Sequence, residues 1–313
     1  LGEGGTLAAV WSRRGTAHLH RRADLPSLAA ALWPLSDADA AARLGWQRSR
    51  LAAAGMPARA ALDVVAEAMG AVVTRPMTKG QVSAAVTERV PEGLSGWCHQ
   101  CQARHVFEQL FRLAGLPAGL QLEPGRSPTT FAPIEGWPGV PRQPADTASL
   151  VETYLALLGP ATMAQAAGYL GTTQAEVRPA WPGGLAEVRV EGRSAWVPGA
   201  ALQALREAPP ARVVRLLPPS DPYLEAGDRT LLVPDKSHQR ALWRVLGPPG
   251  AVLVDGEIAG LWRARAGGRG RLEITVSPFR AVPTPTRAAV EDEAGRVAAV
   301  SGAAAVDVRY QAA

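Results

Sequence analysis

The chain has 313 residues, of which 47% are hydrophobic, and a formal net charge of +5. This length is typical of two domains or three small ones, and no apolar run approaches the ~18 residues that a membrane span needs. Two cysteines in so long a chain argue against a secreted disulfide scaffold and favour a reducing cytoplasm. The charge permits an anionic partner such as nucleic acid. However, only Lys79 and Lys236 of the 33 basic residues are lysines, so the bias of a GC-rich genome explains the charge equally well.

The N-terminal segment pairs a short apolar stretch over residues 6–11 with a basic strand. Polar and apolar residues alternate over residues 16–20, as on a half-buried strand, so His18 and His20 would share one face. Two pairs of arginines flank this strand, namely Arg13 with Arg14 and Arg21 with Arg22. A hydrogen-bonded strand histidine and a metal ligand both remain open interpretations of His18 and His20.

Helix signals dominate the next hundred residues and end in a hairpin signal. Five helices are predicted, over residues 24–32, 36–44, 60–71, 78–89 and 104–116. Thr78 and Gln81 form a capping box at the start of the fourth. Apolar stretches over 120–122 and 130–132 flank a Pro-Gly-Arg turn that contains Arg126, which is typical of a β-hairpin. Helices, a turn and then a hairpin is the order of a winged helix, so we assign residues 57–140 to one, and residues 1–56 to the remnant of an earlier winged helix plus linking helices.

The same order repeats after a proline-rich connector at residues 137–144. Helices are predicted over residues 147–158, 162–170 and 172–181, followed by strands over 187–190 and 195–197 around a turn with Arg193. We assign residues 141–210 to a third winged helix. Its third helix carries only Arg178 as a basic residue, which is unfavourable for reading DNA bases in a groove. Winged helices also serve as scaffolds or protein-binding modules.

Strand signals replace helix signals in the C-terminal segment, residues 211–313. Strands are predicted over residues 213–217, 229–233, 251–254, 257–263 and 271–276. Asp255-Gly256 between apolar runs indicates a hairpin, and residues 287–299 permit a helix. The arginines near one loop, Arg263, Arg265, Arg269 and Arg271, could follow a phosphate backbone or form a solvated face. The predicted fold class is therefore α+β, with tandem winged-helix domains followed by a mainly antiparallel β module.

Both cysteines lie in one short stretch. Cys98 and Cys101 have C-x-x-C spacing, and His105 follows four residues later. The three side chains could supply three ligands of a structural zinc site, with His99, His18 or His20 as a fourth. Free thiols and a redox pair are the alternatives, because a C-x-x-C without a second one does not decide between them. The stretch is expected to be a turn that leads into the helix over residues 104–116.

Four motifs carry a resemblance to a known family. They are Trp11 to His18 (W-S-R-R-G-T-A-H), Leu217 to Leu224 (L-P-P-S-D-P-Y-L), Asp228 to Pro234 (D-R-T-L-L-V-P), and Val252 to Gly256 (V-L-V-D-G) with the following Trp262 to Arg265 (W-R-A-R). In these stretches the chain resembles the winged-helix (HTH_42) family that includes the AlkZ and YcaQ DNA glycosylases. The resemblance implies three tandem winged helices in a C-shape around double-stranded DNA, followed by a C-terminal β module. It also implies hydrolysis of the N-glycosidic bond of alkylated purines, including those in interstrand crosslinks, by a cytoplasmic, nucleoid-associated protein without a catalytic cofactor.

The resemblance also indicates which residues face DNA. They are Arg13, Arg14, His18, His20, Arg21, Arg22, Arg126, Arg193, Arg263 and Arg265. The family's catalytic pair, Gln-apolar-Gln or Gln-apolar-Asp, lies upstream of the R-G-T-x-H motif and is expected outside this chain, so no catalytic residue is assigned. Gln100-Cys101-Gln102 has the same form, but we interpret it as a coincidence because it falls in the second winged helix.

Two other functions remain open. One is a non-catalytic DNA-binding or regulatory protein that uses winged helices as a scaffold. The other is a metal- or redox-sensing regulator built on the cysteine turn. Asp221 is the one carboxylate considered for catalysis, but Ser-Asp-Pro-Tyr indicates first a capped turn.

Overall fold

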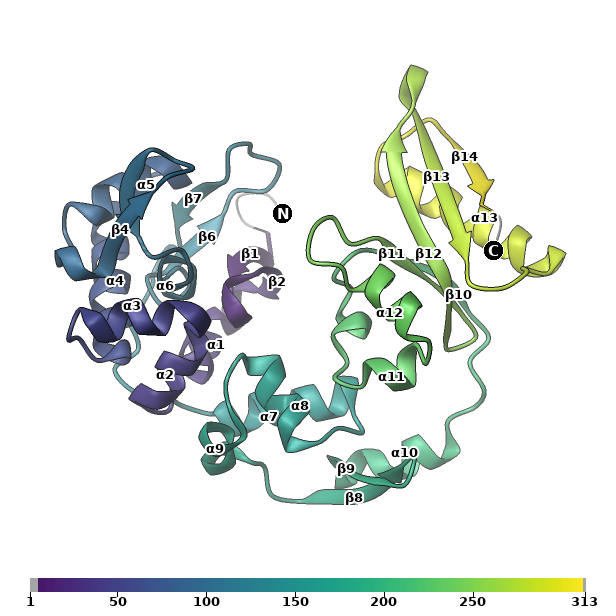
Figure 1. The fold of residues 1–313 in the computed structure, drawn as a ribbon, viewed down its shortest axis with the longest axis horizontal. Coiled ribbons are helices and arrows are strands. Elements are labelled where there is room, and N and C mark those ends of the chain that lie inside the picture. Colours follow the sequence, from purple (N-terminus) through teal and green to yellow (C-terminus); the bar gives the residue numbers. More distant parts are fainter. Residues whose placement is uncertain (1–4, 312–313) are drawn as a thin grey trace. The chain divides into compact units, whose positions relative to one another are not determined.

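The computed structural model describes residues 5–311 (Figure 1). Its internal contacts divide the chain into two compact units, and the first unit ends at Pro198. Both units combine helices with sheets, which confirms the predicted α+β class. The second unit begins at Gly199, which is earlier than residue 211, where the β module was predicted to start. Within residues 5–311, none of the helices has the length and apolar character needed to cross a membrane.

One five-stranded sheet organises the first unit. Its strands are β1 (Leu7–Trp11), β2 (Ala17–Arg21), β3 (Met77–Thr78), β6 (Leu120–Leu122) and β7 (Thr130–Pro133), in the order β2-β1-β6-β7-β3. The N-terminal hairpin joins the later one because Ala9 lies opposite Leu122, and Figure 1 shows these strands together. Strands from before and after the boundary predicted at residue 56 therefore belong to one sheet, and the assignment of residues 1–56 to the remnant of a winged helix stays a prediction.

Six helices accompany this sheet in the first part of the unit. They are α1 (Leu25–Leu32), α2 (Asp37–Arg43), α3 (Arg48–Ala53), α4 (Ala58–Val72), α5 (Lys79–Thr87) and α6 (Glu108–Ala114). The capping box of Thr78 and Gln81 at the start of α5 is confirmed. Trp11, Phe111 and Phe131 meet edge to face in the core, with the centroids of the Trp11 and Phe131 rings 4.9 Å apart.

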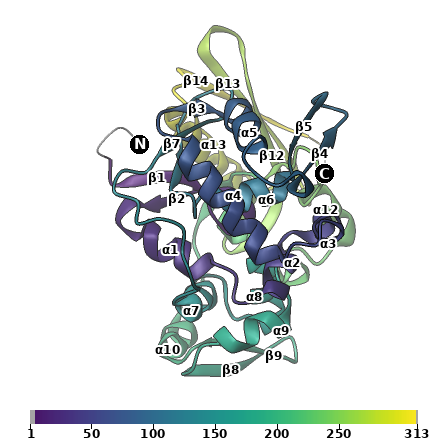
Figure 2. The ribbon, with the colours of Figure 1, turned by 90° about the vertical axis from the view of Figure 1, so that its left-hand side faces the viewer.

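The helix predicted over residues 104–116 is wrong in its first part. Ala103–Val106 is a strand, β5, that pairs antiparallel with β4 (Ser95–Cys98), and helix α6 begins only at Glu108. Figure 2 shows the β4–β5 hairpin beside α5. Val106 and Phe107 are both buried and continue the apolar spacing of α6 from outside the helix. Periodicity alone therefore could not separate the strand from the helix.

The last part of the first unit follows the predicted order of three helices and a hairpin. The elements are α7 (Thr147–Leu158), α8 (Met163–Leu170), α9 (Gln174–Val177), β8 (Leu185–Val190) and β9 (Arg193–Pro198). Helix α9 has only four residues and gives way to a 3-10 turn at Arg178–Ala180, because Pro179 has no N–H to donate. Thr147 Oγ1 donates to the carbonyl of Ala31 over 2.9 Å, which joins α7 to α1. The assignment of these elements as winged helices stays a prediction.

The second unit is built on another five-stranded sheet. Its strands follow chain order: β10 (Val214–Leu217), β11 (Gly250–Val254), β12 (Glu257–Ala266), β13 (Arg271–Pro278) and β14 (Ala305–Tyr310). The first three pairings are antiparallel and the last, β13 with β14, is parallel. The parallel connection runs through α13 (Thr284–Val300), which contains the predicted helix and packs Val290 and Ala294 against the sheet. A short helix, α10 (Leu202–Glu207), precedes the sheet.

The strand predicted over residues 229–233 is wrong. This stretch forms a one-turn helix, α11 (Arg229–Leu232), followed by α12 (Lys236–Leu242). The carboxylate of Asp228 accepts hydrogen bonds from the backbone N–H groups of Thr230 and Leu231 over 3.1 Å each. This aspartate cap favours a helical turn over the extended conformation that the apolar residues alone predict.

Candidate functional site

The motif that begins at Trp11 forms the turn between β1 and β2. Gly15 has φ +70°, and a Cβ added there would lie 2.7 Å from Cβ of Arg112. Both the backbone conformation and the available space therefore require glycine. Arg112 also donates from Nη1 to the carbonyl of Gly15 over 3.4 Å. Arg112 of helix α6 thus packs against the turn and hydrogen-bonds to its backbone.

Ser12 links the two histidines of β2. Its Oγ lies 2.9 Å from Nδ1 of His18 and 3.0 Å from Nε2 of His20, which confirms that the two rings share one face. A hydroxyl has one proton, so Ser12 can donate to one imidazole and accept from the other. Burial, followed by the charge of His18, lowers the pKa of His20, while Asp24 opposes the shift. Both histidines therefore have a hydrogen-bond partner within the hairpin, as the interpretation of hydrogen-bonded strand histidines predicts.

Two of the predicted DNA-facing arginines brace the hairpin against the rest of the unit. The guanidinium of Arg13 donates to the carbonyl of Tyr169 over 3.1 Å and stacks on the same residue's ring, with Cζ 3.9 Å from the centroid. Arg13 also lies 3.4 Å from Nε2 of His18. Arg22 donates to Oε1 of Gln121 over 2.8 Å. These contacts give Arg13 and Arg22 a structural role whether or not they also contact DNA.

The other predicted DNA-facing residues differ in exposure and place. The side chain of Arg21 is 79% exposed and lies 3.3 Å from the carboxylate of Asp24, and Arg14 is exposed in the turn. Arg126 and Arg193 are exposed on the loops before β7 and at the start of β9. Two further arginines belong to the second unit and lie on β12: Arg263 donates to the carbonyl of Gly247 over 2.8 Å, and Arg265 donates to the carboxylate of Glu273 over 2.8 Å. Six of the ten predicted residues thus lie within residues 13–22, on the β1–β2 hairpin and in the 3-10 turn that follows it.

A charged cluster beside Trp11 was not predicted from the sequence. Glu108 accepts from Nζ of Lys79 over 2.7 Å and from Nε of Arg112 over 2.6 Å. Both cations lie over the Trp11 ring, with Lys79 Nζ 5.9 Å and Arg112 Cζ 4.8 Å from its centroid. Burial opposes ionisation of Glu108, yet the hydrogen bonds from Lys79 and Arg112 outweigh it and hold the pKa of this carboxyl below its usual range. The i,i+4 spacing of Glu108 and Arg112 is the only sequence signal for this cluster.

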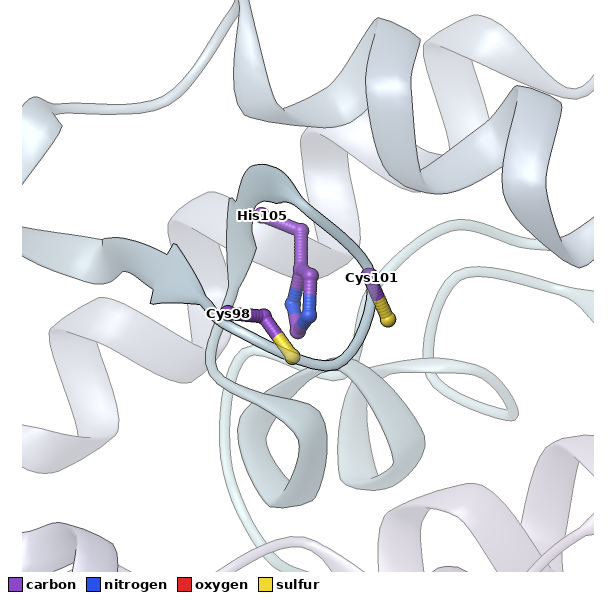
Figure 3. A group of neighbouring side chains, drawn as sticks. All are labelled: Cys98, Cys101 and His105. Carbon is purple, nitrogen blue, oxygen red and sulfur yellow. The ribbon is translucent and has the colours of Figure 1, made fainter.

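Cys98, Cys101 and His105 come together at the loop end of the β4–β5 hairpin. Their ligand atoms all lie within 4.8 Å of one another, and Figure 3 shows the three side chains at the loop end of the hairpin. The backbone N–H of Cys101, then the side chains of His105 and Cys101, hydrogen-bond to the Cys98 sulfur and lower its pKa to about 7. His18 and His20, considered as fourth ligands, bind Ser12 instead. Among the residues described, the cluster consists of these three side chains and does not include His99.

The Gln-apolar-Gln triplet of the sequence lies in the same hairpin loop. Gln102 has φ +49°, and its side-chain Nε2 donates to the carbonyl of His99 over 2.6 Å. Gln100 and Gln102 are both exposed. The amide of Gln102 is therefore used to close the turn, which explains the glutamine locally without a catalytic role.

The motifs in the second unit are used to build its sheet. Asp221 accepts from the backbone N–H of Tyr223 over 2.9 Å, which confirms the predicted capped turn. Trp262 donates from Nε1 to the carbonyl of Leu217 over 2.8 Å. A Cβ at Gly250 would lie 2.2 Å from that indole nitrogen. Glycine is thus needed at position 250 because the Trp262 ring crosses the strand there.

The chain is similar to a known protein family, a curated protein and a solved structure. Residues 1–300 match the family described as DNA glycosylase AlkZ-like. An interstrand DNA cross-link repair glycosylase of Streptomyces sahachiroi is 32% identical over 184 residues, which are 55% of this chain and 47% of that protein. The chain thus spans about half the length of this curated relative in the match. The structure of the Streptomyces sahachiroi DNA glycosylase AlkZ superimposes with a TM-score of 0.72 at 24% identity, covering 98% of this chain and 82% of that one, so the fold is similar. Because the family match covers nearly all of its residues, the chain belongs to the AlkZ-like DNA glycosylase family.

Proposed function

We propose that this protein binds double-stranded DNA and hydrolyses the N-glycosidic bond of alkylated purines, including purines joined in an interstrand crosslink. The family match over residues 1–300 is the observation that carries the proposal. The 32% identical relative is an interstrand DNA cross-link repair glycosylase, which supports the extension to crosslinked purines. The basic hairpin of β1 and β2 supports the DNA partner.

An alkylated purine is already a good leaving group. A purine alkylated on a ring nitrogen is a cation, so it departs as a neutral base when it takes the electron pair of the glycosidic bond. Water adds to C1′ of the sugar and loses one proton. The enzyme must hold this water and stabilise a sugar with oxocarbenium character, while acid catalysis of base departure is hardly needed. We assign none of the residues 5–311 to that step, because the resemblance places the family's glutamine-containing pair upstream of the Trp11 motif.

Arg21 is the strongest candidate for a phosphate contact on the hairpin. It lies on β2, an edge strand of the sheet, with its side chain 79% exposed. Asp24 forms an ion pair with it and is itself 60% exposed. Such a surface pair contributes about 1 kcal/mol at most, so a DNA phosphate could replace Asp24. Arg13, by contrast, already stacks on Tyr169 and donates to its carbonyl.

Base release tests the proposal directly. Protein made from the full reading frame is incubated with duplex DNA that carries a single N7-methylguanine, and the free base is measured by mass spectrometry. We expect release of N7-methylguanine to depend on enzyme concentration and to be absent with unmodified guanine. If the protein binds the duplex but releases no base from methylated or crosslinked DNA, the glycosylase proposal is wrong and the non-catalytic DNA-binding function takes its place.

DNA binding is tested separately through its salt dependence. Replacing one phosphate contact lowers the slope of log affinity against log salt concentration by about 0.9. Arg21→Ala is expected to show this change in a fluorescence anisotropy titration with a plain duplex. Arg240→Ala in α12 of the second unit is the matched control, because it removes the same charge at a position that was not predicted to face DNA. Equal slopes for wild-type protein and Arg21→Ala would exclude Arg21 from the interface.

A further inference from the structure

We propose that Cys98, Cys101 and His105 form a binding site for a single zinc ion. The donor atoms of the three side chains lie within 4.8 Å of one another, and Figure 3 shows the three residues around the β4–β5 loop. Two thiolates and one imidazole are ligands that select Zn²⁺ over Mg²⁺ or Ca²⁺, which prefer oxygen. The argument for this site does not depend on the proposed function.

The backbone of the loop is arranged around the Cys98 sulfur. The N–H groups of Cys101 and Gln100 both donate to Sγ of Cys98. Gln102, directly after the second cysteine, has φ +49°, which turns the chain back into β5. A loop whose amides point at one sulfur stabilises negative charge on it. A zinc-bound thiolate carries such charge, so these amides would favour metal binding by Cys98.

His105 is oriented by its own strand. Its Nδ1 lies 2.8 Å from the carbonyl oxygen of Val106, so Nδ1 carries the proton and donates it to that carbonyl. Nε2 is then the ring nitrogen left for the hydrogen bond with the Cys98 sulfur, and it would give up its proton when it binds the metal. Zinc-binding histidines regularly use the second ring nitrogen in this way, because the hydrogen bond fixes the tautomer and the ring orientation.

The fourth coordination position falls to water. Cys101 is exposed and Cys98 is partly exposed, so solvent reaches the cluster. Glu108 is the carboxylate whose charge acts on both Cys101 and His105. Its oxygen already accepts from Lys79 and Arg112, with distances of 2.7 and 2.6 Å. Those two hydrogen bonds retain the Glu108 carboxylate in its own cluster.

The ion would hold together the loop end of the β4–β5 hairpin. The strands pair only over Ser95–Cys98 and Ala103–Val106, and two-stranded hairpins are marginally stable alone. At its base the hairpin is anchored to α5, since Val106 N–H donates to Oγ1 of Thr87 over 3.2 Å. The loop end projects beyond that anchor. A metal that joins Cys98 to Cys101 and His105 therefore ties the loop to both strands.

Metal analysis of the 313-residue chain tests the proposal. The protein is expressed with added zinc, purified under reducing conditions and analysed by mass spectrometry for metal. We expect about one zinc per chain, and after exchange with Co²⁺ a tetrahedral spectrum with a sulfur-to-cobalt charge-transfer band. Cys98→Ser and Cys101→Ser should each lower the zinc affinity on the order of 100-fold or more, since even removal of an outer-shell partner costs 10–100-fold.

Three variants separate metal binding from folding. His99→Gln changes a histidine of the same loop that lies outside the cluster and should keep the zinc. His105→Gln should lose it, whereas His105→Cys should restore it because it supplies a third thiolate. The proposal is overturned if the reduced wild-type protein takes up no stoichiometric zinc. It is equally overturned if His99→Gln loses as much as Cys98→Ser, or if His105→Cys fails to recover binding while its circular dichroism matches that of the wild type.

Discussion

Oγ of Ser12 lies 3.0 Å from Nε2 of His20, although the residues are eight positions apart in the sequence. The β1–β2 register brings them together, because Val10 pairs with His18 and Ala8 pairs with His20 on the same face. Ser12 is only 6% exposed, so its hydroxyl depends on the two histidines for hydrogen bonds. We therefore expect this group of three polar side chains to make the hairpin sensitive to pH.

His20 should make the protein less stable in mild acid. The folded chain lowers its pKa below the ordinary value of 6.5, first through burial and then through the charge of His18. The unfolded chain therefore binds the proton more readily, and stability is lost as pH falls below about 6.5 toward the folded pKa. We expect His20→Gln to lose less stability than wild-type protein between about pH 7.5 and about pH 5, as measured by urea unfolding across that range.

His18→Gln is the matched control for this experiment. It removes the smaller, Coulombic cause of the shift and leaves the burial of His20, so most of the pH dependence should persist. His105 has a raised pKa, mainly from its hydrogen bond to Val106, and so acts in the opposite direction. That contribution is common to all three proteins and cancels in the comparison. Superimposable pH profiles of His20→Gln and wild type would contradict the assignment.

Arg13 should matter for stability through its geometry as well as its charge. Arg13→Ala removes the stacking on Tyr169 and the hydrogen bond to its carbonyl, so we expect a loss of about 1–3 kcal/mol in the free energy of unfolding. Arg13→Lys should recover only part of it, because lysine lacks the planar fork that stacks and donates together. Arg126→Ala, at an exposed loop position, should change stability by less than about 0.5 kcal/mol. Chemical denaturation measures all three, and an Arg13→Lys variant as stable as wild type would refute the stacking argument.

The buried ion pair of α2 should be the most costly of these contacts to break. Asp39 has a fully buried side chain, and its carboxylate accepts from Arg43 at Nε over 2.8 Å and at Nη2 over 2.7 Å. Asp39→Ala leaves the Arg43 guanidinium buried without its counter-charge, which typically costs about 3–5 kcal/mol. Thermal or urea unfolding would show this loss.

An exposed pair provides the comparison for Asp39. Glu67 and Arg142 are 3.1 Å apart with side chains 52% and 77% exposed, so Glu67→Gln should cost less than about 1 kcal/mol. Comparable losses for the two variants would mean that burial does not determine the strength of the Asp39–Arg43 pair.

Features that depend on neighbouring residues could be predicted from the sequence. The Thr78–Gln81 capping box begins α5, and Asp255-Gly256 turns β11 into β12. In each case the side chains that determine the backbone lie within a few residues of it, so the sequence pattern contains the whole cause. The cysteine–histidine cluster belongs here too, because both cysteines and His105 lie within one hairpin.

Features that depend on distant partners were decided by the tertiary structure. The pattern over residues 104–116 fits one helix, yet Ala103–Val106 pairs with β4, and its backbone groups bond to another strand. The N-terminal hairpin likewise joins β6 because Ala9 meets Leu122 across the sheet. The sequence by itself determined the local caps, turns and family motifs of this protein. Only the tertiary structure decided which strands pair and which arginines are already bound, because those contacts join residues whose separation in the chain leaves no periodic signal.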